Sequence, residues 1–326
     1  MKKSTQKMNE RLKGSLLVFI GACSFGILST IVKTAYDYGY TLGEVTGSQT
    51  MLGMLILWLV YWVTKQLKKN KSQQKIHNST HQTTSKNKTS SWKVMFAGIF
   101  TGLVGIFYYQ CVKLIPASIA IILLMQNVWI SMLIETVAFR KRPSRAQLFS
   151  AVIVLIGTVL AAGIMNDKVS LNGAGVIYGL LAAFSYSIFI ITSGRVGNDL
   201  DVIHKSALMI TGACAITFII FPPAFLFNGL LFKGLIKWGL ALAIFGTVIP
   251  PFLFSKGIPL TGVSLGAILG AAELPVAVLS SKFVLHEQVT VVQWIGVIII
   301  LTAIVIPNLP KRRNNHIIIN RADSRF

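Results

Sequence analysis

The sequence predicts an all-α integral membrane protein that has ten transmembrane helices in two inverted five-helix repeats, with both termini in the cytoplasm. Three observations support this prediction: the composition, the number of long apolar runs and a weak internal repeat. Of the 326 residues 53% are hydrophobic and only 13% are charged, whereas charged residues make up about 25% of a typical soluble domain. We therefore expect most of the chain to lie in a lipid bilayer.

Long apolar runs recur along almost the whole sequence. A hydrocarbon core about 30 Å thick requires about 20 mainly apolar residues for each helical crossing. The runs of about this length are Gly14 to Val32, Val45 to Thr64, Val94 to Val112, Ala117 to Phe139, Leu148 to Met165, Gly173 to Ser193, Ala207 to Phe225, Trp238 to Phe254, Gly262 to Phe283 and Val291 to Ile306. Because most segments between them are too short to form a domain, the functional chemistry is expected to lie within the membrane.

The positions of the basic residues predict the orientation of these helices. If the N-terminus is cytoplasmic, the inner segments contain 25 of the 31 Lys and Arg residues and the outer segments contain 6. Since Lys and Arg are concentrated in cytoplasmic loops, this difference places both termini inside. The net charge of +21 does not indicate nucleic-acid binding, because the basic residues do not form a stripe with aromatic residues. Anionic lipids of the bilayer are their expected partners.

Two polar segments lie outside the apolar runs. Residues 65–93 are basic and almost free of apolar side chains, so they are predicted to form a disordered cytoplasmic loop. Residues 307–326 are predicted to form a basic cytoplasmic tail. His77 and His81 in the loop have no further ligand nearby, which favours a solvated loop over a metal site. The three cysteines all fall within apolar runs, and an odd number there argues against a disulfide framework.

The internal repeat divides the chain into residues 14–165 and residues 173–306, with five apolar runs each. Adding 146 to the residue number aligns residues 118–159 with 264–305 without a gap, although only 8 of the 42 positions are identical. The motifs "ACSFG", starting at Ala22, and "AFSYS", starting at Ala183, also lie at the same depth in the first run of each unit. Because five is odd, the second unit enters the membrane from the opposite side, and the repeats are inverted.

Glu273 is a carboxyl group near the middle of the ninth run. A charged side chain at the bilayer centre costs at least about 2.5 to 3.5 kcal/mol on insertion scales. Its helical face is shared with the small residues Gly262, Gly266, Gly270 and Ala277. This spacing favours a cavity wall or a close helix contact over lipid. Pro275 has no amide hydrogen, so the helix is expected to bend or break and to free the carbonyl of Ala271.

Two interpretations of Glu273 remain open at this stage. In the first, Glu273, with Gly270 and Pro275 beside it, contacts a substrate or carries a proton, since burial disfavours the charged form of a carboxyl group. In the second, a neutral Glu273 only satisfies the backbone that Pro275 has opened. The first is favoured because carboxylates inside a membrane usually mark a transport pathway.

Further polar side chains within the runs are candidates for the same pocket. They are Ser24, Tyr108, Tyr109, Gln110, Gln126, Asn127, Trp129 and Ser185. Gln126, Asn127 and Trp129 lie at the depth of Glu273 in the matching run and suit neutral recognition, or else interhelical hydrogen bonds. The aromatic group near the outer end of the third run also fits an interface marker, and the two serines are weak candidates because a serine often bonds its own helix.

Two other features inside the runs are interpreted structurally. Pro250 and Pro251 predict a second helix break, in the eighth run. Glu135 is interpreted as structural, because it stands near the cytoplasmic end of its run, within reach of Arg140 or Lys141.

An intramembrane enzyme that acts on a lipid or peptide is the alternative class. Aspartyl enzymes of this kind need two aspartates within the bilayer, but Asp37, Asp199 and Asp201 fall in connecting segments. Serine and metal enzymes need a histidine in mid-span, and none of the five histidines lies there. We therefore expect no catalytic residue, no metal site and no cofactor.

The motifs "KLIPASIAIIL", starting at Lys113, and "GAAELPVAVLSSKFVLHEQVTVVQWIGVIII", starting at Gly270, resemble those of the EamA type of the drug/metabolite transporter superfamily. The resemblance covers both repeats. It implies a multi-pass permease of the inner cell membrane with a central cavity, commonly an exporter of amino acids or other small metabolites. Glu273 and Pro275 match the Glu-X-Pro that the ninth helix of this family often carries.

Other positions agree or disagree with the family pattern. His286 and Glu287 match a polar pair at the end of the ninth helix. In the first half, residues 127–129 stand where proline is usual, Lys141 replaces a glutamate, and Gln49 stands where arginine is common.

The resulting hypothesis is a secondary active or facilitative transporter that moves a small metabolite by alternating access. A small molecule and the bilayer are the expected partners, with proton coupling through Glu273 as an option and no nucleic acid. The sequence does not identify the substrate, the direction of transport, the coupling ion or its stoichiometry. It also leaves open whether the chain forms a homodimer and whether Glu273 carries protons or is structural.

Overall fold

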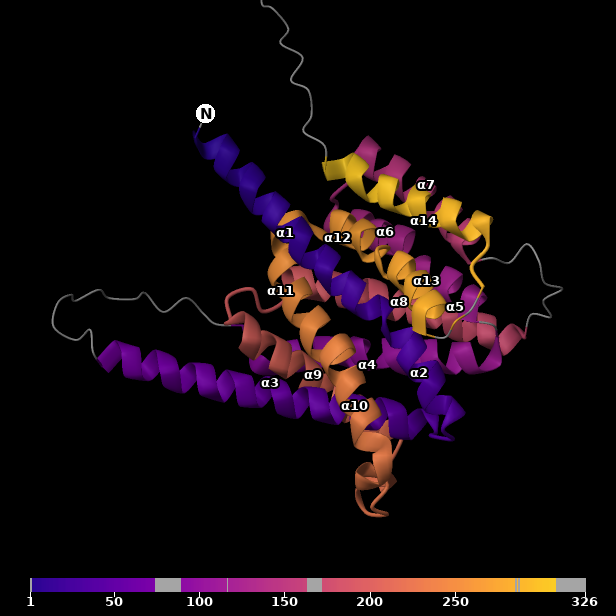
Figure 1. Cartoon of the computed structure of the whole chain (residues 1–326). Coiled ribbons are helices and arrows are strands. Elements are labelled where there is room, and N and C mark those ends of the chain that lie inside the picture. Colours follow the sequence, from indigo (N-terminus) through magenta and orange to yellow (C-terminus); the bar gives the residue numbers. More distant parts are fainter. Residues whose placement is uncertain are drawn as a thin grey trace, which may run out of the picture.

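A computed structural model describes most of the chain (Figure 1). The described residues are 2–73, 89–115, 117–162, 172–284, 286 and 288–308. All regular structure within these ranges is helical. This agrees with the all-α class that the sequence predicts.

The helices follow one another along the chain with short connections. In the first half they are α1 (Lys2–Gly26), α2 (Leu28–Asp37), α3 (Leu42–Gln73), α4 (Ser91–Leu114), α5 (Ala117–Met125), α6 (Asn127–Phe139) and α7 (Arg145–Ala161). In the second half they are α8 (Gly173–Arg195), α9 (Val202–Ile220), η2 (Ala224–Leu226), η3 (Leu231–Leu235), α10 (Ile236–Leu242), η4 (Ala243–Val248), α11 (Ile249–Thr261), α12 (Val263–Gly270), α13 (Glu273–Val284), α14 (Val291–Val305) and η5 (Ile306–Asn308).

Eight stretches within the described ranges are helical, long and apolar enough to cross a membrane, and several consist of two or more helices in line. They coincide with eight of the ten predicted runs. The other two runs correspond to α7 and α14, which are apolar but have only 17 and 15 residues. At 1.5 Å per residue, such helices span roughly 22 to 26 Å. Ten crossings therefore remain a prediction.

The sequence offset of 146 recurs in the helix boundaries. The paired first residues are Ala117 and Val263 for α5 and α12, Asn127 and Glu273 for α6 and α13, and Arg145 and Val291 for α7 and α14. Arg140 and His286, again 146 apart, are the two non-glycine residues with positive φ in the described chain, at 53° and 55°. The backbone of the last three helices in each half therefore follows one plan, although few side chains are identical.

The N-terminal caps of α7 and α14 also repeat. In α7, the hydroxyl group of Ser144 accepts a hydrogen bond from the backbone N–H of Gln147, whose side chain returns to the backbone N–H of Ser144. Thr290 and Gln293 make the same pair of contacts at the start of α14. Such a capping box satisfies two of the amide groups that a helix start leaves without partners.

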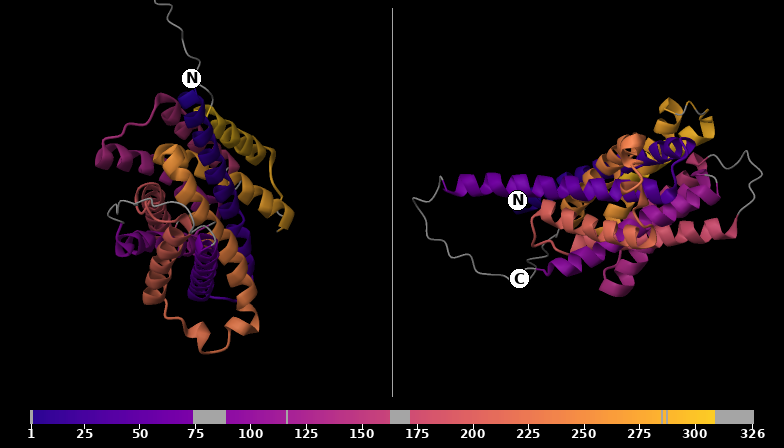
Figure 2. Two further views of the ribbon diagram at one scale, coloured as in Figure 1. Left: turned by 90° about the vertical axis from the view of Figure 1, so that its left-hand side faces the viewer. Right: turned by 90° about the horizontal axis from the view of Figure 1, so that it is seen from below.

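Helices of one half pack along helices of the other half. The helix α1 of the first half packs along α11 of the second, and α8 of the second packs along α4 of the first. The helices α7 and α14, which end the two halves, lie side by side at the edge of the molecule (Figures 1 and 2). Arg11 donates a hydrogen bond to the carbonyl of Pro307, at 3.2 Å. Residues near both ends of the described chain therefore lie on the same face.

The structure corrects the boundaries of the predicted loop at residues 65–93. Helix α3 continues to Gln73, and α4 begins at Ser91. With 32 residues, α3 is about 48 Å long, well beyond the bilayer core of about 30 Å, and it projects from the other helices in both views (Figures 1 and 2). Lysine and glutamine are good helix formers in water, so the helix does not end where the apolar run ends. His77 and His81 lie outside the described residues.

A surface ion pair joins this projection to α9. The Nζ atom of Lys68 lies 2.6 Å from Oδ2 of Asp201, the residue that caps α9. The hydrogen bond from Lys68 holds the pKa of Asp201 below its usual range. Because both side chains are substantially exposed, the pair contributes little to stability.

The predicted break at Pro250 and Pro251 takes a milder form than expected. The chain stays helical, but η4 before the prolines is a π-helix in which the N–H of Ile249 donates to the carbonyl of Ile244. In this register the carbonyl of Phe245 faces Pro250, which has no N–H. The hydroxyl group of Ser24 donates to that carbonyl instead, at 2.6 Å. A side chain of the first repeat thus repairs the helix of the second.

Candidate functional site

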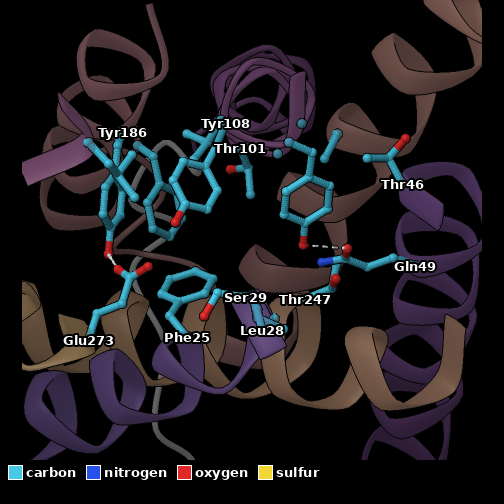
Figure 3. Close-up of a pocket in the computed structure, with 18 of the residues that line it drawn as sticks. Phe25, Leu28, Ser29, Thr46, Gln49, Thr101, Tyr108, Tyr186, Thr247 and Glu273 are labelled. Carbon is cyan, nitrogen blue, oxygen red and sulfur yellow. Dashed lines mark hydrogen bonds between the residues drawn. The ribbon is translucent and has the colours of Figure 1, made fainter. Parts of the chain in front are cut away.

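A central cavity lies between the two halves of the chain (Figure 3). Residues of α1 to α5 line it from the first half, and residues of α8, α9, η4 and α13 line it from the second. Its volume is about 80 Å³ as the space open to the centres of water molecules, and about 850 Å³ when all empty space up to the outside is counted. Since a buried water needs roughly 10–15 Å³ on the first measure, the cavity holds several waters or a small solute.

The break between α12 and α13 delivers a carboxyl group to this cavity. Ala271 and Ala272 form a turn, and Glu273 is the first residue of α13. Pro275 falls in the first turn of α13, where backbone N–H groups have no helical partner, so its missing hydrogen is not felt. The carbonyl of Ala271 is not left unpaired as predicted, because it accepts a hydrogen bond from the N–H of Leu274 at 3.2 Å.

The carboxyl group of Glu273 is buried but lines the cavity. Its Oε2 atom lies 3.5 Å from the hydroxyl group of Tyr186, which donates to it. The ring of Phe25 stands edge-on to that of Tyr186, with centroids 6.0 Å apart, and Figure 3 shows both rings beside the carboxyl group. A Cβ atom on Gly26 would collide with the carbonyl oxygen of Glu273, so α1 approaches the break this closely only with glycine there.

The opposite part of the cavity is polar but uncharged. The hydroxyl group of Tyr109 donates to Oε1 of Gln49, at 3.1 Å. The side chain of Thr247 is only 3% exposed, and within the described structure its hydroxyl group has no hydrogen-bond partner. Thr247 belongs to the π-helix η4 and lines the cavity wall. An unpaired buried hydroxyl group is costly, which indicates that a water or a solute completes this wall.

An ion-pair network around the buried carboxyl group of Glu135 connects helices of the two halves. The side chain of Glu135 in α6 is 1% exposed, and its Oε1 atom lies 3.0 Å from Nη2 of Arg195 and 3.3 Å from Nζ of Lys141. Its Oε2 atom accepts hydrogen bonds from the backbone N–H of Ser264, at 3.0 Å, and from the Ser264 hydroxyl group, at 2.5 Å. These contacts tie the end of α6 to the end of α8 and to the start of α12. The charge distribution predicts that this face is cytoplasmic.

Lys205 strengthens the same face. Its side chain is 1% exposed. Its Nζ atom donates to the carbonyl of Ser193, at 2.7 Å, and to the side-chain oxygen of Asn198, at 2.8 Å. Lys205, which the sequence assigns to a cytoplasmic loop, is therefore a buried residue of α9 that binds the end of α8.

A second hollow lies at the other ends of these helices. It is wider, about 620 Å³ on the first measure, and it is lined by the start of α3, the end of α4, part of α8 and the segment after α9. Phe107 and Gln110 of this hollow flank Tyr108 and Tyr109 of the central cavity along α4. The two hollows are therefore lined by different faces of the same turn of α4.

Comparison with known proteins identifies the family. The sequence matches the EamA-like transporter family over residues 12–163 and residues 173–309, one match for each repeat. The chain belongs to this family. One solved structure, described as "Crystal structure of protein", has 16% sequence identity and a TM-score of 0.65, over 90% of this chain and 96% of that one, which shows a shared fold. A search of curated proteins gives no match.

Membership in the EamA-like family confirms the resemblance found in the sequence and makes the protein a multi-pass, transporter-like membrane protein. It gives the intramembrane enzyme no support. Within the described ranges, no three His, Cys, Asp or Glu side chains are grouped closely enough to hold a metal ion.

The structure brings together only part of the predicted site. Glu273, Tyr108 and Tyr109 line the central cavity, whereas Gln110 lines the second hollow. Gly270 lies beside the cavity wall, since a Cβ atom there would be 3.8 Å from the Tyr186 hydroxyl group. The remaining candidates lie outside the lining of the central cavity; these are Ser24, Gln126, Asn127, Trp129, Ser185 and Pro275.

The amides of the first-half break turn back onto their own helix. The Nε2 atom of Gln126 donates to the carbonyl of Ile122 at 3.0 Å, and Nδ2 of Asn127 donates to that of Leu124 at 2.8 Å. Trp129 donates to Oε1 of Gln126 at 2.8 Å and is 44% exposed on the surface. These contacts are local, three or four residues apart, and differ from the interhelical hydrogen bonds that the sequence offered as the structural alternative.

The serines act across the repeat boundary. Ser24 donates to the carbonyl of Phe245. The Ser187 hydroxyl group shares its one hydrogen between the carbonyl of Ala183 in its own helix, at 2.8 Å, and that of Asn127, at 3.2 Å, at the break between α5 and α6. Ser185, which occupies the position in the second repeat that is equivalent to Ser24, is buried in α8.

Sequence reasoning missed several residues of the cavity. Tyr186 lies in the motif "AFSYS", of which only Ser185 is among the predicted site residues. Gln49 is identified from the sequence only as a departure from the family pattern, and Phe25 and Thr247 are not among the predicted residues. Of these, Tyr186 carried a usable signal, because a tyrosine in mid-span needs a hydrogen-bond partner. Glu287 lies outside the described residues.

Proposed function

We propose that this EamA-like protein carries a small polar or amphipathic metabolite, such as an amino acid, across the inner cell membrane by alternating access. The solute binds in the central cavity, and Glu273 contacts it or exchanges a proton as it binds. Export is the proposed direction, since export is common among the proteins that the sequence resembles. The transport is secondary active if Glu273 carries protons, and facilitative if it does not.

The observation that carries this proposal is the position of the Glu273 carboxyl group. It stands at a helix break, inside a cavity that both repeats line. Inverted repeats around a central site are the geometry in which each half alternately opens. The ion pairs of Glu135 connect helices of the two halves at one end, and the second hollow lies at the other ends of these helices.

The structural alternative for Glu273 is weakened by the backbone around it. A neutral Glu273 was the expected partner for the carbonyl of Ala271, but Leu274 already donates to that carbonyl. The carboxyl group therefore has no backbone repair to perform at this carbonyl. Its contact with Tyr186 and its place in the cavity wall favour a role toward solute or proton.

Reconstituted transport tests the proposal. Metabolites that raise the thermal unfolding temperature of the detergent-purified protein would be tested for uptake into proteoliposomes. A carrier exchanges its solute, so unlabelled solute inside the vesicles should accelerate the uptake of labelled solute outside. Uptake without such exchange would indicate a channel, and turnover of a substrate by the purified protein without vesicles would favour the enzyme alternative.

A further inference from the structure

We infer that the central cavity selects protonated amines and excludes solutes that carry a free carboxylate. The inference rests on the proposed transport function and names its substrate class. Within the small polar or amphipathic metabolites of the proposed function, it selects organic amines that have a neutral polar group, and it excludes amino acids whose carboxylate is free.

The first argument is the charge of the cavity wall. Glu273 carries the one carboxyl group among the lining residues that the structure describes, and none of those residues is Lys, Arg or His. The ion-pair network uses Arg195 and Lys141 for Glu135, which is not among the lining residues. A carboxylate entering this cavity would be desolvated without a counter-charge, which is strongly unfavourable. A protonated amine is desolvated as well, but the ionised Glu273 supplies its counter-charge.

The second argument is the aromatic surface around the carboxyl group. Phe25 and Tyr186 stand beside Glu273. Phe189 stacks on Tyr186, with ring centroids 5.9 Å apart and planes 20° apart. Ammonium groups are attracted to the faces of such rings, and most strongly where water is excluded. Aromatic rings beside a carboxyl group favour an ammonium group over a carboxylate at this end of the cavity.

The third argument is the neutral polar wall across the cavity. Thr247 has an unpaired buried hydroxyl group, and Gln49 presents an amide. Both donate and accept hydrogen bonds without charge. This wall suits a hydroxyl, amide or ester group of the solute, but it provides no cation for a carboxylate.

Binding of the amine is coupled to the proton of Glu273. Without a cation, burial favours the neutral form of the Glu273 carboxyl group, and the one hydrogen bond from Tyr186 only partly opposes this. When a protonated amine binds, the carboxyl group of Glu273 releases its proton to water. The amine adds one positive charge and the released proton removes one, so the net charge of the cavity does not change. The other titratable side chains in the wall are Tyr108 and Tyr109 of α4 and Tyr186 of α8. The lining residues of α1, α2, α3, α5, α9 and η4 include no titratable side chain.

Three probes that share a phenyl ring test the charge selection. Phenethylamine is a cation, phenylalanine adds a carboxylate to the same skeleton, and hydrocinnamate carries the carboxylate without the amine. The full-length protein in proteoliposomes would be assayed for labelled uptake of each probe, with a pH indicator trapped inside. We expect saturable uptake of phenethylamine with protons moving the opposite way, and uptake of the other two at least ~10-fold slower, equal to about 1.4 kcal/mol.

Failure of this inference can be told apart from failure of the proposed function. Uptake of phenylalanine or hydrocinnamate as fast as that of phenethylamine overturns the charge selection but leaves the transporter intact. Exchange of a solute that carries a free carboxylate, while all three probes are inert, has the same meaning. If no solute that stabilises the protein is exchanged, both proposals fail.

Two variants locate the selection in the cavity. Glu273→Gln removes the counter-charge, so phenethylamine uptake should fall at least ~10-fold, while the protein stays monodisperse in detergent because the change keeps the size of the side chain. Gln49→Arg adds a cation to the neutral wall and should raise the ratio of phenylalanine to phenethylamine uptake. An unchanged ratio in Gln49→Arg, in protein with unaltered thermal unfolding, would contradict the assignment of the neutral wall.

Discussion

The two helix breaks of this protein share one backbone plan but use their polar side chains in opposite ways. In the first repeat, Gln126 and Asn127 turn their amide groups onto carbonyls of the preceding turn, those of Ile122 and Leu124. At the equivalent break of the second repeat, Glu273 extends into the cavity.

The difference follows from what each side chain can donate. An amide carries two N–H groups and can satisfy carbonyls that a broken helix frees, whereas a carboxyl group has one O–H group when neutral and none when ionised. Glu273 therefore finds its partner in another helix, the hydroxyl group of Tyr186. The helix break is therefore a structural feature that both repeats share. The side chain placed at the break decides which of the two contributes to the cavity.

The largest effect is expected from removing the charge of Glu273. Glu273→Gln should fold and insert, but its transport should lose its dependence on pH and slow by at least ~100-fold, about 2.7 kcal/mol, since no proton can be exchanged. The rate of solute uptake into proteoliposomes across a range of pH measures this. Asn127→Ala is the matched control, and it should keep the pH dependence. Transport by Glu273→Gln with the wild-type pH dependence would reduce that residue to scaffold.

The second effect concerns the closed face, where Glu135 has Ser281 as its mate 146 residues later. Glu135→Gln removes the ion pairs with Arg195 and Lys141 and should shift the protein toward opening on that face by roughly 10-fold, or about 1.4 kcal/mol. A cysteine at Ser29 in the cavity, with the three native cysteines replaced, should then react faster with an impermeant maleimide from that face. Equal labelling rates would show that the network does not hold the face closed.

A third effect would exchange the chemistry of the two breaks. Asn127→Asp replaces an amide that donates to Leu124 with a group that cannot donate when ionised, at a position 2% exposed. We expect a loss of about 1 to 3 kcal/mol in stability, seen as a lower unfolding temperature in detergent. The change in unfolding temperature caused by Asn127→Asp should therefore differ in sign or size from the change caused by Glu273→Gln. A stable Asn127→Asp variant would mean that the first break, like the second, can host a carboxyl group.

The smallest effects should come from the serines that cross between repeats. Ser24→Ala and Ser187→Ala each remove one hydrogen bond to a carbonyl at a helix irregularity, that of Phe245 or of Asn127. Each change should lower stability by about 0.5 to 1.5 kcal/mol. The double variant should lose close to the sum, because the two contacts do not share a partner. Thermal unfolding of the four proteins in one detergent gives the comparison.

Much of the fold was predictable because bilayer thickness and helix geometry restrict it. The apolar runs, the offset of 146 and the break near Pro275 all follow from spacing along the chain. The ends of α3 were not predictable from hydropathy, since its polar extension is held by helix propensity in water. The π-helix before Pro250 was also missed, because its repair by Ser24 depends on a contact between distant segments.

The candidate site was less predictable than the fold. The sequence singled out Glu273 because a carboxyl group in an apolar run is conspicuous. It could not show that the Asn127 amide donates to the carbonyl of Leu124, or that Gln49, Thr247 and Tyr186 line the same cavity. Those facts depend on the rotation of each helix about its axis. Hydropathy carries little information about this rotation where every face is apolar.

The contact between Arg11 and Pro307 has a consequence for the order of synthesis. Since the two ends meet on one face, joining them by a short linker adds no crossing. A circular permutant opened between Ala162 and Asn172 would then present the second repeat to the insertion machinery first. The sequence predicts that this repeat starts from the opposite face. The orientation of the permutant in the membrane would therefore show whether the leading helix or the finished assembly determines the topology.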